Sequence, residues 1–191
     1  MEQAYREEKT FDSIDFTQNA PAKGEYERCT FVSCDFSNAD LAGVKLVECE
    51  FEGCNLSMAK VINTDLRDIK FKNCKMLGLH FENCNPFGLA VNFDHCNLNH
   101  SSFYQTKLKK TIFKNTTLHE VDFTACDLSS SVFDCCDLAR ATFERTVIEK
   151  ADLRTSYNYS IDPELNRIKK ARFSLPGVIG LLDKYDIDIS P

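Results

Sequence analysis

Large apolar residues recur every five positions along most of the chain. Residues 29–58 read CTFVS, CDFSN, ADLAG, VKLVE, CEFEG and CNLSM, with Phe or Leu always third and Cys, Ala or Val always first. The second position is polar, and the fourth and fifth are mostly polar. Because a helix repeats every 3.6 residues and a strand every two, a period of five excludes either as the repeating unit.

The same register extends far beyond this stretch. It runs from Phe11 to Phe81, slips by two residues, and resumes from Phe93 to Leu153. Fourteen of the fifteen phenylalanines are repeat centres, and Phe87, inside the slip, is the exception. An internal repeat sustained over this length is typical of a solenoid, in which each unit packs against its neighbours.

Like residues also recur every twenty positions once the slip is counted. Four five-residue sides would form one coil of twenty residues, and successive coils would stack about 4.8 Å apart, as parallel strands do. We therefore predict an all-β solenoid, a quadrilateral β-helix of about eight coils. The column that defines the repeat contains Phe11, Phe31, Phe51, Phe71, Phe93, Phe113, Phe133, Leu153 and Phe173.

Because the five-residue register ends at residue 173, we expect two regions. Residues 1–173 form the β-helix, with a polar N-terminal cap over residues 1–10 and the slip at residues 82–93. Residues 174–191 form a C-terminal helix and tail, in which Ser174 caps the helix and Pro176 lies in its first turn. Apolar residues at helical spacing would form either a lid over the last coil or a lid that also joins two chains in a homodimer. These residues are Val178, Leu181, Leu182 and Tyr185.

The slip contains residues typical of a turn. Pro86 and Gly88 interrupt the repeat, and Pro86 has no N–H to donate to a neighbouring coil. We expect Phe87, between them, to leave the regular core. The segment is therefore either a local bulge or a small recognition site with Phe87 at its tip.

The ten cysteines mostly occupy one position of the repeat. Nine of them lie two residues before a centre and should point inward, whereas Cys135 should face solvent. The N-terminus has no apolar segment typical of a secretory signal, so we expect a reducing cytoplasm and free thiols. Buried free cysteine packs as a small hydrophobic residue, and parallel stacked side chains suit a disulfide poorly. The clearest column contains Cys34, Cys54, Cys74 and Cys96.

Charge and hydropathy argue against two classes of partner. The chain has 23 basic and 29 acidic residues, a formal net charge of −6, and three lysines close together at Lys107, Lys109 and Lys110. A generic nucleic-acid binder would have a basic excess. No apolar run approaches the roughly 18 residues that a membrane-spanning helix needs. We expect neither direct nucleic-acid binding nor a membrane span.

No motif predicts an enzyme, a cofactor or a metal centre. The phosphate-binding and dinucleotide-binding glycine patterns and the HExxH zinc motif are absent from the sequence. His95 and His100 flank Cys96, but Cys96 is expected to point inward, away from both. A solenoid with a filled interior also has no cleft in which a nucleophile and a base could meet.

The repeat units resemble those of the pentapeptide repeat family, A(D/N)LXX. Matching units are ADLAG at 39–43, CNLNH at 96–100, CDLSS at 126–130, CDLAR at 136–140 and ADLRT at 151–155. The resemblance covers roughly residues 11–173. It implies a right-handed quadrilateral β-helix without enzyme activity, in which the centre and the small residue two positions before it point inward.

The C-terminal segment RFSLPGVIGLLDKYDIDIS resembles the end of Qnr-type members of this family. The resemblance implies a homodimer joined at the C-terminal ends and binding to a topoisomerase, DNA gyrase or topoisomerase IV, through mimicry of duplex DNA. Two features depart from that type: the slip adds only two residues where Qnr proteins have two long loops, and no face is uniformly acidic. A structural or scaffolding module with an unknown partner therefore remains the alternative.

Overall fold

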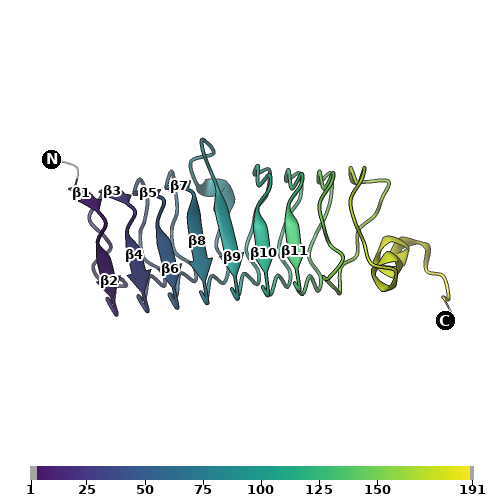
Figure 1. Ribbon diagram of the computed structural model, residues 1–191, viewed down its shortest axis with the longest axis horizontal. Helices are drawn as coiled ribbons and strands as arrows, with labels where there is room; N and C mark the ends of the chain where they lie inside the picture. Colours follow the sequence, from purple (N-terminus) through teal and green to yellow (C-terminus); the bar gives the residue numbers. More distant parts are fainter. Residues whose placement is uncertain (1–3, 190–191) are drawn as a thin grey trace.

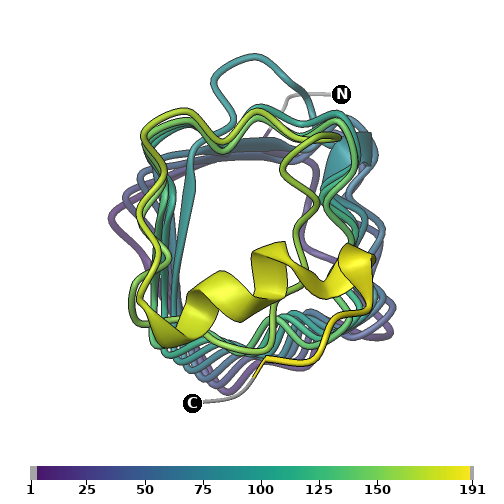
Figure 2. The same cartoon turned by 90° about the vertical axis from the view of Figure 1, so that its right-hand side faces the viewer.

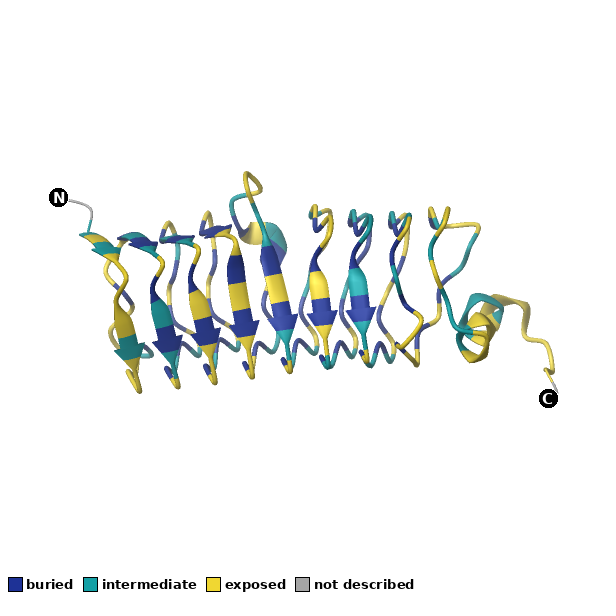
Figure 3. Cartoon of the chain, viewed as in Figure 1, coloured by how far each residue is buried: buried dark blue, intermediate teal, exposed yellow. Residues whose placement is uncertain are grey.

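A computed structural model of the protein describes residues 4–189. The chain winds into a four-sided coil whose turns stack along one long axis (Figures 1 and 2). The predicted all-β quadrilateral solenoid is thus confirmed. Apolar centres point into the coil and polar residues point outward, so burial alternates along each side (Figure 3).

Eleven short strands form two parallel sheets in the described residues. One sheet has the order β1-β3-β5-β7 and the other the order β11-β10-β9-β8-β6-β4-β2. The strands are β1 (Ala4–Glu7), β2 (Thr10–Asp12), β3 (Gly24–Glu27), β4 (Thr30–Val32), β5 (Lys45–Val47), β6 (Glu50–Glu52), β7 (Asp65–Arg67), β8 (Ile69–Lys72), β9 (Val91–Asp94), β10 (Ile112–Lys114) and β11 (Val132–Asp134).

Equivalent residues of successive coils face one another directly. Phe31 pairs with Phe51 across β4 and β6, an offset of twenty residues. Across β8 and β9 the offset rises by two, so that Phe71 pairs with Phe93. The insertion at residues 82–93 is therefore absorbed within a single coil, and the ladder resumes in the same register.

A residue in the left-handed backbone region turns the chain at the end of most five-residue sides. Arg28, Ser33 and Asn38 have φ values of 50°, 51° and 58°, and Gly43 follows at 73°. This conformation costs a non-glycine residue roughly 1–2 kcal/mol. The N–H of such a residue still bonds the next coil, as between Arg28 N and Val47 O at 2.9 Å, which offsets the strain. The turn repeats every five residues, and so does the sequence.

Residues 4–10 of the expected N-terminal polar cap belong to the first coil, and most of them are exposed. Strands β1 and β2 extend both sheets by one coil, and Lys9 O accepts a hydrogen bond from Thr30 N at 2.9 Å. Residues 1–3 of the predicted cap lie outside the described part. The first coil is therefore itself the N-terminal end of the ladder, with Phe11 only half-buried there.

The last coil departs from the square path. The structure has about seven regular turns, one fewer than expected. After Leu153 the chain buries Tyr159 and Ile161, whereas Pro163 lies half-exposed. Ile161 N donates to Gly180 O at 2.8 Å, which ties this coil to the C-terminal segment.

The C-terminal segment is helical but not α-helical. It forms two 3-10 helices, η2 (Pro176–Leu181) and η3 (Asp183–Tyr185), and η2 lies across the open end of the coil (Figure 2). A further 3-10 turn, η1 (Phe81–Asn83), precedes the insertion. Ser174 is not the N-cap residue, which is Leu175, but its Oγ accepts a hydrogen bond from Gly177 N at 3.1 Å.

Ala125 provides a test of the turn geometry, because it occupies a left-handed position with φ of 56°. We expect Ala125→Gly to raise the free energy of unfolding by about 0.5 kcal/mol, since relief of the strain outweighs the added flexibility of the unfolded chain. The matched control is Ala139→Gly, at a half-buried position whose backbone is not left-handed. This substitution should lower the free energy of unfolding by about 0.5–1 kcal/mol. Urea denaturation of both variants measures the difference; equal effects would contradict the account.

Candidate functional site

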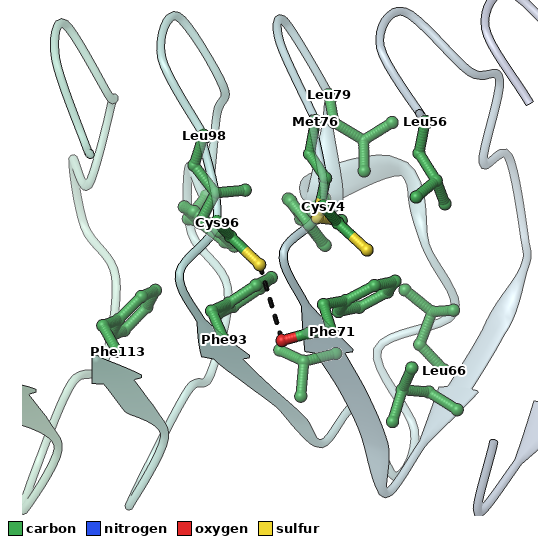
Figure 4. Close-up of a cluster of buried hydrophobic side chains, with 14 of the residues drawn as sticks. Leu56, Leu66, Phe71, Cys74, Met76, Leu79, Phe93, Cys96, Leu98 and Phe113 are labelled. Carbon is green, nitrogen blue, oxygen red and sulfur yellow. Dashed lines mark hydrogen bonds between the residues drawn. The ribbon is translucent and has the colours of Figure 1, made fainter. Parts of the chain in front are cut away.

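The predicted core column fills the interior of the coil. Phe31 and Phe51 stack with ring centroids 4.6 Å apart, and Phe113 and Phe133 with centroids 4.7 Å apart. Figure 4 shows part of this packing, with Phe71, Phe93 and Phe113 in line. The column members between the two ends are buried, whereas Phe11 and Phe173 are only partly so. Side chains therefore fill the space inside the coil.

The cysteine column lies beside the phenylalanine column. Cys54 Sγ donates to Phe31 O at 3.3 Å, and Cys96 Sγ donates to Phe71 O at 3.4 Å (Figure 4). Cys34 and Cys74 make the same contact with the coil before them. All ten cysteines are free thiols, nine of them buried and Cys135 exposed.

Burial suppresses ionisation of several of these thiols. It raises the pKa of Cys84, Cys126 and Cys136 to about 12, because a thiolate would lose its hydration inside the coil. A reactive cysteine needs the opposite shift and access to solvent. A hydrogen bond with Cys74 does lower the pKa of Cys96, but Cys96 is buried. The buried cysteines therefore act as packing residues.

The histidines do not converge on these cysteines. Each lies on the outside of the coil beside a carboxylate. The pairs are His80 with Glu82, His95 with Asp94, His100 with Glu120 and His119 with Asp137. Within residues 4–189, no three His, Cys, Asp or Glu side chains are grouped so that they could hold a metal ion. In the same residues, no helix has both the length and the apolar composition needed to cross a membrane.

Outward charges of opposite sign face each other on successive coils. Lys70 Nζ lies 2.6 Å from Glu50 Oε1, and Lys72 Nζ lies 3.1 Å from Glu52 Oε1, each pair twenty residues apart. The second column continues in register from Lys72 to Asp94. Because each coil neutralises the next, this sheet face carries no continuous line of negative charge.

The three lysines noted in the sequence, Lys107, Lys109 and Lys110, have different surroundings. Lys109 Nζ lies 3.1 Å from Asp127 Oδ2. Lys110 occupies a left-handed turn position with φ of 63°. Lys107 borders the hollow beside the inserted loop. One of the three lysines is therefore neutralised by a carboxylate of the next coil.

The insertion projects from the coil as a loop (Figures 1 and 2). Asn85 anchors it: its N–H bonds Thr64 O at 3.0 Å, and its side chain bonds Asp65 Oδ1 at 2.6 Å. Phe87 is 79% exposed, the highest value among the aromatic residues outside the core that the structure describes. Gly88 has φ of 76°, and a side chain there would meet Arg67.

A hollow lies beside this loop. Its floor contains Phe81 and Cys84, which are buried, and its walls include Pro86, Phe87 and Leu89. From the next coil, Tyr104, Gln105, Thr106 and Lys107 complete it, and Glu82 contributes a carboxylate. The sequence analysis placed Phe87 outside the core but did not identify Glu82 or Tyr104, because the repeat predicts which residues stack and not where a hollow opens beside the loop.

The C-terminal end combines a covered and an uncovered side. Leu181 packs against the core and Leu182 is half-buried, whereas Val178 and Tyr185 are 38% and 51% exposed. The four residues predicted as one stripe are thus divided between two environments. Further exposed apolar side chains of this end are Leu175, Ile179, Ile187 and Ile189.

Comparison with known proteins identifies the repeat. A family model described as "Pentapeptide repeat region" matches residues 25–87 and 78–153. Two trypsin-treated forms of QnrB1, a plasmid-mediated fluoroquinolone resistance protein, superpose with TM-scores of 0.63 and 0.64 at 19% identity, each covering 98% of both chains. HetL, a pentapeptide repeat protein from a Nostoc cyanobacterium, matches at 15% identity over 89% of this chain and 85% of its own, with a TM-score of 0.46. Comparison with curated protein sequences finds no match.

Three buried thiols, Cys84, Cys126 and Cys136, predict a loss of stability at alkaline pH. Their pKa in the folded chain is raised above the ordinary value of 9.0, so the unfolded chain releases these protons first. Their contribution is fully present below pH 9 and is lost as pH rises from 9 towards 12. The unfolding free energy should fall less steeply with pH in this window for Cys136→Ala than for the wild type. We expect the difference in slope to be about 1.4 kcal/mol per pH unit, the contribution of one proton.

Chemical denaturation at several pH values between 8 and 11.5 measures this slope. Cys135→Ala is the matched control, since Cys135 is the neighbour of Cys136 in the sequence but has its thiol exposed in the folded chain, and it should leave the slope unchanged. An unchanged slope for Cys136→Ala, or equal effects of the two variants, would contradict the account.

Proposed function

Because the chain belongs to the pentapeptide repeat family, we propose that it is a non-enzymatic protein-binding module whose partner is a type II topoisomerase such as DNA gyrase. The observation that carries the proposal is the correspondence of fold with QnrB1 over 98% of both chains. The filled interior supports it, because recognition is then left to the outer faces, the inserted loop and the ends.

The surface favours contact through shape and side chains over mimicry of duplex DNA. A duplex has one negative charge per about 1.7 Å of its axis. Here Lys45 lies 3.8 Å from Glu25, and Lys70 and Lys72 pair with Glu50 and Glu52, so acidic columns are interrupted by lysines. The inserted loop, with Phe87 at the surface, is the part of the coil side that supports specific recognition best.

The second candidate is a structural or scaffolding module with a different protein partner. The neutralised charge columns favour it, because a topoisomerase that binds DNA would be attracted most strongly by a continuous acidic face. Both candidates need the same folded coil. They differ only in the partner.

We also propose that two copies of the chain associate through the C-terminal end. Leu175, the N-cap residue of η2, and Ile179 within η2 are 88% and 51% exposed, and the exposed Ile187 and Ile189 border the same hollow as Ile179. Helix η2 covers the last coil with Leu181 while it presents these side chains outward. A second copy that packs on this apolar surface would remove it from water.

A supercoiling assay separates the two candidate partners. Purified protein at micromolar concentration should inhibit DNA gyrase, or protect it from a fluoroquinolone, because an occupied enzyme surface cannot bind DNA. The heat-denatured chain serves as the control for nonspecific effects. If the protein neither inhibits the enzyme nor protects it, the topoisomerase is refuted as the partner and the scaffolding module remains.

Sedimentation equilibrium tests the dimer. We expect the wild-type chain to show twice its mass of 21.8 kDa, and Ile179→Asp to show the monomer mass, because a buried unpaired carboxylate is strongly unfavourable. Ile112→Asp is the matched control, on the side of the coil and 46% exposed, and should remain dimeric. A monomeric wild-type chain would rule the dimer out.

A further inference from the structure

The hollow beside the inserted loop contains an unused hydrogen-bond acceptor. Glu82 Oε1 lies 2.9 Å from His80 Nδ1, but Glu82 Oε2 is buried and has no hydrogen-bond partner in the part of the chain that the structure describes. A buried carboxylate oxygen without a donor is unfavourable. The Glu82 side chain as a whole is 25% exposed and lines the hollow, so a small rotation of its carboxylate brings this oxygen to a donor supplied from outside.

The walls of the hollow restrict which donor fits. Phe87 and Tyr104 are 79% and 39% exposed, from the loop and from the next coil, and Pro86 and Leu89 add apolar surface. Aromatic rings and a carboxylate that line one hollow suit a planar cation, because a guanidinium stacks on a ring while its N–H groups bond the carboxylate. An ammonium satisfies the carboxylate but stacks less well.

We propose that this hollow binds an arginine side chain of a partner protein. The guanidinium donates to Glu82 Oε2 and lies between Phe87 and Tyr104. The inference rests on the proposed function in assuming a protein partner, but its chemistry is independent of which protein that is.

The charged groups of the chain around the hollow are compatible with this ligand. Arg67, which lies under Gly88, is held by Asp65 at 2.6 Å and is not one of the residues lining the hollow. Lys107 is exposed and forms no ion pair with the described residues. Its flexible ammonium can turn to solvent, or donate to a backbone carbonyl beside the bound arginine.

The test uses short capped peptides and the full-length chain. A blocked Gly-Arg-Gly peptide is titrated into the ¹⁵N-labelled protein, and amide shifts are followed by NMR. Saturable shifts should be confined to the loop and the facing coil, around Phe87, Gly88, Leu89 and Gln105. The citrulline peptide, equal in shape but uncharged, should bind at least about tenfold more weakly, and the lysine peptide should fall between them.

Variants then assign the shifts to the hollow. Glu82→Gln should weaken the arginine peptide at least about tenfold, and Phe87→Ala several-fold. Glu144→Gln is the matched control, because Glu144 is an exposed glutamate three coils further along the column that contains Glu82 and Tyr104. It makes the same change of charge and should bind as the wild type does. Unchanged amide shifts outside the loop show that each variant is folded.

Three results would overturn the inference: no saturable shifts at the loop, equal binding of the arginine and citrulline peptides, or equal affinity of the wild type and Glu82→Gln. These outcomes do not depend on DNA gyrase. If the peptide binds as expected and the supercoiling assay is negative, the arginine site stands and the topoisomerase is the wrong partner.

Discussion

The structure depends on backbone hydrogen bonds between residues one coil apart. Residues such as Phe31 and Phe51 can pair only if each coil has the length of the one before it. A polar backbone group left without a partner in the wall of the coil would be costly, so the coil length is strongly constrained. The twenty-residue repeat of the sequence follows from this requirement.

Stacking in register brings equivalent side chains together. Inside the coil it forms continuous columns, such as Phe113 on Phe133, and the thiol column of Cys54 and Cys74 beside them. Outside the coil it would bring like charges together, and lysine opposite glutamate on successive coils avoids that repulsion. Regular stacking therefore produces a well-packed interior and an electrically mixed surface.

The surfaces proposed for recognition lie where the stacking is interrupted. The inserted loop places Phe87 in solvent and opens a hollow against the next coil, because its two additional residues have no partners in the ladder. The C-terminal end stops the ladder with η2, which covers the last coil with Leu181 and leaves Ile179 exposed. These two places combine apolar surface with irregular backbone, as binding surfaces often do.

The sequence by itself determined the repeat, the coil length, the inward residues and the position of the insertion, because each depends on spacing along the chain. It did not predict that residues 4–10 join the sheets, that the C-terminal helix is a 3-10 helix, or that Val178 and Leu181 lie in different environments. The tertiary structure alone decided these features, and it alone showed the hollow that Glu82 and Tyr104 line. The reason is physical: at the ends and at the loop the ladder lacks a neighbouring coil, so contacts in space replace the repeat as the determinant of structure.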